Sequence, residues 1–363
     1  MKSTAAPVVL LAALMLPEAG CQFFFPTPIE QEAAEANAAP APNAVRSYGT
    51  AFYPGEVMKA DVYLDSIVVG RGELRAVKAC DAKGVPAVRV ELSAESVGVG
   101  KMLKSASIST SSLLELDSGM PIAGWGDTVI GDEETVVESL FERSKFQYQL
   151  TRSTKEKTNK PQYGEVVLPI EGVPHDAESV LGYVRNWHPA DGTTGYLYVS
   201  SGRYPWRAQL TFVGSETLTT EQGEEKALRI EGVAQKLSGK NLTSSPTSAP
   251  RHFTLWFSDD DRRAPLRILL ETAVAKITVE LTSYAREEPK DDPSLACEPL
   301  FDEKSLLAKV AARKKRQKDA KDARDRSVKP TAPKAAPPVR RTDHDDESKE
   351  GKEDKDGVDK LLR

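Results

Sequence analysis

The chain of 363 residues lacks several features that would assign it to a common functional class. After the first 20 positions it has no run of about 20 apolar residues, so no transmembrane helix is expected there. Its formal net charge of -5 does not indicate a nucleic-acid-binding protein. It has no glycine-rich phosphate loop and no serine in a nucleophile elbow. No motif therefore predicts a catalytic site, a metal site or a cofactor.

The N-terminus predicts export. A positive Lys2 is followed by an apolar segment over residues 5–16, which is too short to span a bilayer but typical of a signal peptide. Ala19 and Gly20 then precede Cys21, and this junction resembles the lipobox of bacterial lipoproteins. We therefore expect residues 1–20 to be a signal peptide and Cys21 to be lipidated, which would anchor the chain to a membrane.

One residue departs from the lipobox pattern, because Glu18 stands where an apolar residue is usual. The alternative is ordinary signal cleavage near Gly20, which would yield a soluble secreted protein. For a lipidated chain, Gln22 after the cysteine favours the outer membrane, with the protein facing the periplasm or the cell surface. Residues 21–47 are rich in Pro and Ala, which predicts a flexible tether.

Residues 48–286 are predicted to form one β-rich domain. Apolar and polar residues alternate over 58–64, 88–94 and 277–281, which is typical of half-buried antiparallel strands. Only residues 175–186 predict a helix, which Asp176 can cap. Many strands with one short helix indicate a large antiparallel sheet, strongly curved or partly closed into a barrel.

Four ordered segments lie at residues 53–74, 175–185, 212–223 and 255–281. Together they resemble the bacterial domain-of-unknown-function family numbered 3108, over about residues 48–286. The resemblance implies an exported, β-rich protein and no established activity, and it implies a structural role for the motif residues. These are Pro54, Gly55, Glu56, Asp176, Ser179, Arg185, Glu216, Trp256, Ser258, Asp259, Asp260 and Pro265.

The acidic residues Asp259, Asp260 and Asp261 permit two interpretations. With His175, His188 and His252 they could form a metal or general-base site, but their spacing matches no known ligand motif. Asp side chains close turns through nearby backbone groups, so we favour a hairpin turn. For His188, between Trp187 and Pro189, a structural contact is the simpler interpretation.

The three cysteines predict one disulfide. If Cys21 is acylated, Cys80 and Cys297 remain as a pair in an oxidising compartment. A bond between them would tie the start of the sheet to its end. The alternative is two free thiols, with Cys80 buried and Cys297 in a surface loop.

The C-terminal segment changes in character. After a connecting loop over 287–302, residues 303–326 predict a basic helix of net charge +6. Asp302 can cap this helix, and its first two turns have a short apolar face. The helix is either a solvated extension or a contact for an anionic surface of the envelope. Residues 327–363 are expected to be disordered.

Two function classes follow. The first is a non-catalytic binding or carrier module whose concave sheet holds a hydrophobic or envelope-derived ligand. The second is a scaffold lipoprotein whose sheet is filled by its own side chains and whose basic helix contacts envelope partners. An empty apolar cavity above about 300 Å³ on the concave face would favour the first. A hydrolase is the least favoured alternative.

Overall fold

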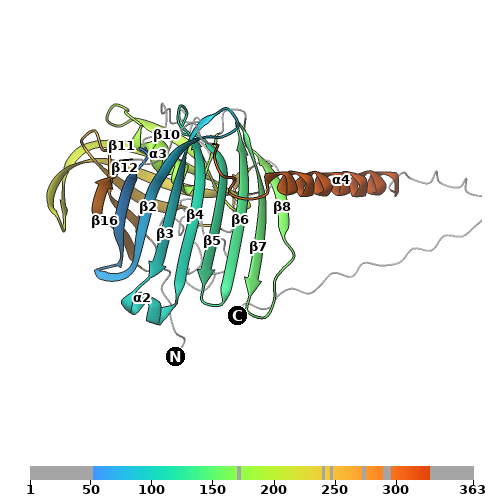
Figure 1. The fold of residues 1–363 in the computed structure, drawn as a ribbon, viewed down its shortest axis with the longest axis horizontal. Coiled ribbons are helices and arrows are strands. Elements are labelled where there is room, and N and C mark those ends of the chain that lie inside the picture. The colour runs from blue at the N-terminus through green and yellow to red at the C-terminus, as the bar shows by residue number, and fades with distance from the viewer. Residues whose placement is uncertain are drawn as a thin grey trace, which may run out of the picture. The chain divides into compact units, whose positions relative to one another are not determined.

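The computed structural model describes residues 52–169, 173–238, 242–245, 248–271, 275–288 and 296–327. The predicted signal peptide, Cys21, the tether, and all of the predicted tail except Ser327 lie outside these residues. The described chain is mainly β (Figure 1), in agreement with the fold class predicted from the sequence.

In the described part of the chain, sixteen strands form the sheet. The first eight are β1 (Glu56–Leu64), β2 (Ile67–Asp81), β3 (Pro86–Ser96), β4 (Ala106–Glu115), β5 (Pro121–Ile130), β6 (Glu133–Glu142), β7 (Lys145–Thr154) and β8 (Gln162–Val167). The others are β9 (Pro174–His175), β10 (Thr194–Ser201), β11 (Tyr204–Thr220), β12 (Gly223–Ser238), β13 (Thr243–Ser244), β14 (Arg251–Ser258), β15 (Pro265–Glu271) and β16 (Lys276–Arg286). The helices are α2 (Gly98–Leu103), α3 (Ala177–Arg185) and α4 (Glu303–Ser327).

The strand order is β8-β7-β6-β5-β4-β3-β2-β1-β16-β15-β14-β12-β11-β10-β9, and β13 pairs with β12. Strands β2 to β8 lie side by side as a meander (Figure 1). Strand β1 pairs antiparallel with β16, so the first and last strands of the domain are neighbours at the centre of the sheet. The short pairing of β9 with β10 is parallel. Within the described residues the two edge strands, β8 and β9, do not pair, so the sheet is curved but not closed.

One hydrophobic core joins both halves of the sheet. Its buried side chains come from β1–β4, from β10–β12 and β14–β16, and from α3. Leu181 and Val184 of α3 and the following Trp187 belong to this core. The sheet therefore wraps around α3, and burial of the apolar stripe of α3 stabilises both elements.

The structure contains one short helix more than the sequence predicted. Helix α2 begins at Gly98, whose φ is +49°, a conformation that glycine adopts without strain. At Gly100 a Cβ atom would lie 2.1 Å from the backbone oxygen of Val69, so only glycine permits this close packing on β2. Because glycine disfavours helices, tertiary packing and not local propensity explains α2.

Helix α4 begins as the sequence predicts. The Asp302 carboxylate accepts a hydrogen bond from the Ser305 amide at 3.0 Å, which caps the helix. Leu306 and Val310 are buried, with exposed fractions of 1% and 2%, so the first two turns pack on the protein and are not a solvated extension. No helix in the described part of the chain is long and apolar enough to cross a membrane.

Candidate functional site

The family-motif residues Glu56 and Arg185 form a buried ion pair between the start of β1 and the end of α3. Arg185, at the end of α3, donates from Nη1 and Nη2 to the Glu56 carboxylate at 3.0 and 2.7 Å. Both side chains have 0% exposure. The guanidinium also donates to the backbone oxygens of Arg262 and Arg263, at 2.7 and 2.9 Å. Four hydrogen bonds therefore join the start of β1, the end of α3 and the turn between β14 and β15.

Aromatic side chains enclose this ion pair. The Phe52 ring centroid lies 5.2 Å from Cζ of Arg185. Burial, and second a hydrogen bond with Glu56, raise the pKa of Tyr284 to about 12. The neutral Tyr284 phenol can therefore donate to the carboxylate at physiological pH. The arrangement satisfies a buried charge pair, which is a structural role.

The acidic motif after β14 forms a turn. Ser258 Oγ donates to Asp260 Oδ1 at 2.7 Å and accepts from the Ala264 amide at 2.8 Å. Asp260 also accepts from the Arg262 amide at 3.0 Å. Asp259 accepts from Ser215 Oγ at 2.9 Å. Asp260 is thus engaged within the turn, as the turn interpretation requires, whereas Asp259 joins the turn to β11.

The other motif residues also make structural contacts. Trp256 Nε1 donates to Glu216 at 2.6 Å, across the face of the sheet opposite the core. Gly55 has a φ of +85°, and its amide donates to the backbone oxygen of Ala76 at 2.7 Å. Pro54 lies in the turn that precedes β1, and Pro265 begins β15.

The histidines do not join the acidic triplet in a metal site. Within the described residues, no three His, Cys, Asp or Glu side chains come together in a group that could hold a metal ion. His188 Nδ1 lies 2.8 Å from the backbone oxygen of Asn186, a local contact after α3. His175 is fully buried, and burial lowers its pKa to about 3, so its ring is neutral.

The N-terminus of α3 carries two acids, the half-buried Asp176 and the buried Glu178. Asp176 Oδ1 accepts from the Ser179 amide, and Ser179 Oγ accepts from the Asp176 amide, both at 2.9 Å, which completes a capping box. Asp176 Oδ2 also accepts from Ser112 at 2.5 Å. Glu178 accepts from the Thr110 hydroxyl. Burial and then the charge of Asp176 raise the pKa of Glu178 to about 8, and burial raises the pKa of Asp176 as well.

These acids line a cavity of about 120 Å³ on the concave face. Two glycines on β5 make room for the helix terminus, because a Cβ at Gly124 would lie 3.0 Å from Asp176 Oδ2. A Cβ at Gly126 would lie 3.2 Å from the Thr110 methyl group. Apolar side chains of the lining include Leu92, Ile108, Trp125, Val137, Phe141, Leu150 and Ala177. The sequence analysis missed this site, although the Gly-x-Gly spacing on β5 was a signal for close approach of another element.

A second depression, of about 470 Å³, lies on the opposite face of β11, β12, β14 and β15. Arg229, Glu231, His252 and Glu271 contribute to its lining, together with Trp256. Its lining is mixed, because charged side chains lie beside Val233, Phe253 and Leu269, and this mixture suits an acyl chain less well than an apolar wall would.

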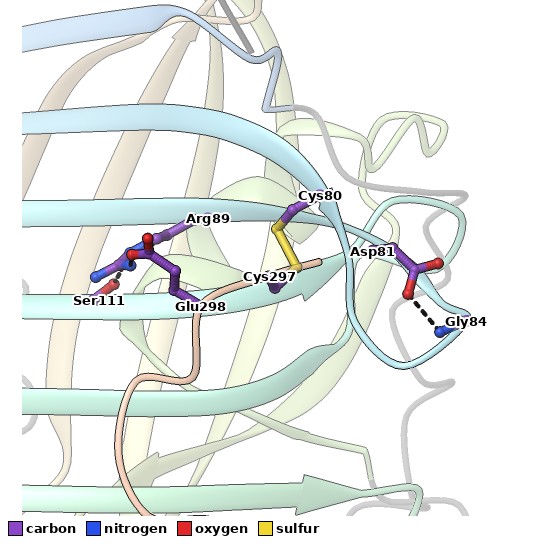
Figure 2. Close-up of a disulfide and its surroundings, with 7 residues drawn as sticks. All are labelled: Cys80, Asp81, Gly84, Arg89, Ser111, Cys297 and Glu298. Carbon is purple, nitrogen blue, oxygen red and sulfur yellow. Dashed lines mark hydrogen bonds and ion pairs between the residues drawn. A yellow bond between two sulfur atoms is a disulfide. The ribbon is translucent and has the colours of Figure 1, made fainter. Parts of the chain in front are cut away.

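The predicted cysteine pair is joined in the structure (Figure 2). The Cys80 and Cys297 sulfur atoms are 2.13 Å apart and their Cα atoms are 5.0 Å apart. The Cys297 amide also donates to the backbone oxygen of Asp81 at 2.7 Å. Glu298 lies 3.9 Å from Arg89 of β3. The bond therefore holds the segment before α4 against the ends of β2 and β3.

Polar contacts extend the docking of α4. Lys309 donates to Gln149 of β7 at 3.2 Å, and its ammonium lies 5.5 Å from the ring centroid of Tyr163 in β8. Lys314 forms an ion pair with Glu165 of β8. Part of the basic charge of α4 is therefore used within the protein, against strands β7 and β8.

The fold and the buried contacts define a curved β-sheet protein that wraps around one short helix. The sequence model of the family described as "Protein of unknown function (DUF3108)" matches residues 59–282, and the chain belongs to this family. No curated protein matches the chain.

Comparison with solved structures also found matches. A β-barrel-like protein of the domain of unknown function DUF1849 from Brucella abortus is 8% identical, with a TM-score of 0.41, over 68% of this chain and 100% of that one. A protein with a YmcC-like fold from Bacteroides fragilis is 8% identical, with a TM-score of 0.32, over 66% and 100% of the two chains. The lipoprotein LppX from Mycobacterium tuberculosis is 11% identical, with a TM-score of 0.19, over 66% and 88%.

Proposed function

We propose that this chain is a non-catalytic lipoprotein of the bacterial cell envelope that acts as a scaffold and not as a carrier of acyl chains. The observation that carries this proposal is the filling of the concave face. Core side chains and α3 occupy that face and leave a cavity of about 120 Å³. A binding module for an acyl chain needs a cavity of at least about 300 Å³.

Sequence and covalent structure support the envelope location. The apolar segment over residues 5–16 and the junction at Cys21 favour export followed by lipidation. The disulfide between Cys80 and Cys297 suits an oxidising compartment. To test the anchor, cells expressing the wild type or Cys21→Ala would be fed radiolabelled palmitate. We expect label only on the wild type; equal label on both proteins would refute the anchor.

The basic helix is the proposed contact with envelope partners. Lys315, Arg316, Lys318 and Lys321 of α4 are exposed. Each cation near an anionic membrane surface contributes about 1 kcal/mol, so the four together favour binding to phosphate-bearing lipids.

The experiment is co-sedimentation of the full chain carrying Cys21→Ala with vesicles containing anionic phospholipid. Replacing the four α4 residues with Gln should reduce binding about tenfold or more. A matched control replaces four exposed lysines elsewhere, Lys155, Lys157, Lys160 and Lys226, with Gln. Equal loss in both variants, or no loss in the α4 variant, would contradict the proposed contact.

A carrier of a hydrophobic ligand is the second candidate, because the walls of the concave cavity are largely apolar. Mass spectrometry of material that co-purifies with the detergent-extracted protein separates the two. A stoichiometric acyl compound would overturn the scaffold proposal, whereas its absence from repeated preparations would support it.

A further inference from the structure

The cavity beside α3 has an uncompensated acidic wall. Asp176 and Glu178 both line it, and Glu178 has 3% exposure. Among the described residues, no Lys or Arg forms an ion pair with either carboxyl group. His175, beside them in sequence, is neutral because it is buried. A buried carboxylate without a cation is unfavourable, so Glu178 holds its proton up to a pKa of about 8, and a cation that entered the cavity would stabilise its ionised form.

Buried hydroxyl groups provide the second observation. Thr135, Ser139, Ser200 and Ser201 line the same cavity, and their exposed fractions lie between 5% and 8%. In the described part of the chain no hydrogen bond engages these four hydroxyls, and their oxygen atoms are not fully buried but open to the cavity. Each of these hydroxyls can therefore donate to or accept from a ligand within the cavity.

The apolar walls of the cavity restrict the size and chemistry of the uncharged part of the ligand. Leu92, Ile108, Val137, Phe141 and Leu150 present hydrocarbon to the space. An apolar cavity of about 150 Å³ holds a molecule of the size of benzene, so about 120 Å³ accommodates a short aliphatic group. A bare metal ion would leave these apolar walls unoccupied.

We propose that the cavity between the N-terminus of α3 and strands β4–β7 binds a small aliphatic ammonium ion, with Glu178 and Asp176 as its counter-charges. The ammonium group donates to Glu178 and to the hydroxyls of Ser139 and Ser201. The alkyl group contacts Val137 and Leu150. This site goes beyond the scaffold function and does not depend on it.

The test uses the full chain carrying Cys21→Ala and three isosteric probes: n-butylammonium, n-butanol and butyrate. Isothermal titration and saturation-transfer NMR measure their binding. We expect n-butylammonium to bind at least tenfold more tightly than n-butanol, and butyrate not to bind. Equal binding of n-butylammonium and n-butanol would overturn the proposal, because the acidic wall would then contribute nothing.

Three variants locate the site. Glu178→Gln removes one counter-charge and should weaken n-butylammonium binding about tenfold. Ser139→Leu fills the cavity and should abolish binding, which keeps the test decisive if Glu178→Gln fails to fold. Glu138→Gln is the matched control, since Glu138 precedes Ser139 on β6 and faces the opposite side of the sheet, and it should bind normally.

Titration with metal ions tests whether the cavity binds a metal instead of an organic cation. Titration with Na⁺ and Ca²⁺ should give no competition with n-butylammonium at equal concentration. Competition by either ion that Glu178→Gln abolishes would identify a metal site and overturn the proposed organic cation. Normal n-butylammonium binding in Ser139→Leu would show that the probe binds elsewhere, which would also overturn the proposal.

Discussion

The pair formed by Glu56 and Arg185 gives the sharpest test of how this fold is held together. Glu56→Gln leaves the guanidinium of Arg185 fully buried without its counter-charge. Removing one partner of a buried ion pair costs about 3–5 kcal/mol, so we expect a loss of this size in the free energy of unfolding. The carbonyl contacts of Arg185 remain in this variant.

Arg185→Met should cost more than Glu56→Gln. It leaves the Glu56 carboxylate unpaired and also removes the donors to the backbone oxygens of Arg262 and Arg263. Each buried carbonyl that loses its donor adds about 1–3 kcal/mol. The turn between β14 and β15 should then lose its attachment to α3.

A double-mutant cycle isolates the ion pair. In the double variant Glu56→Gln, Arg185→Met, no buried charge remains, so its cost should be at least about 2 kcal/mol less than the sum of the two single costs. Urea unfolding of all four proteins under non-reducing conditions, with equal m-values, gives the four free energies. Single costs below about 1 kcal/mol, or strict additivity, would refute the reasoning.

Three further predictions follow from the described contacts. Thiol titration of envelope-derived protein under denaturing, non-reducing conditions should find Cys80 and Cys297 without free thiols, and Cys297→Ser should lower the free energy of unfolding by at most about 5 kcal/mol for a separation of 217 residues; two free thiols would refute the bond. Deleting residues 327–363 should change stability by less than about 0.5 kcal/mol, whereas deleting 303–363 removes the buried Leu306 and Val310 and should cost about 3 kcal/mol or more; equal melting points for both truncations would contradict the docking of α4. Because the pKa of Glu178 rises from 4.5 to about 8 on folding, the folded state binds the extra proton between these values, and stability should fall as pH rises through this window; urea midpoints at pH 5 and pH 8 should differ less in Glu178→Gln than in the wild type, and an identical pH dependence would argue against the shift.

The sequence predicted strands where apolar and polar residues alternate, so that one face of the strand is apolar. The alternation over 58–64, 88–94 and 277–281 predicted β1, β3 and β16. Strands β4 and β5 were not predicted, because Ser, Thr and Gly occupy inward positions there and conceal the period of two.

At the candidate site, too, the sequence predicted local features but not contacts between distant elements. The sequence alone predicted the helix with its Asp176 cap, the turn after Trp256, and Cys80 and Cys297 as the candidate disulfide pair. Each of these depends on local backbone chemistry or on a count of residues. It did not predict that Glu178 would share a cavity with Ser139 and Ser201, because these residues come from different elements.

By itself, the sequence determined the β-rich character of the domain, its family and the position of its helices α3 and α4. These follow from periodicity, capping residues and ordered motifs, which act within a few neighbours along the chain. Only the tertiary structure decided that β1 pairs with β16, that Glu56 meets Arg185, and that the concave face retains a cavity of about 120 Å³. These depend on how a sheet curves and which side chains then fill it, a property of packing between residues far apart in the sequence.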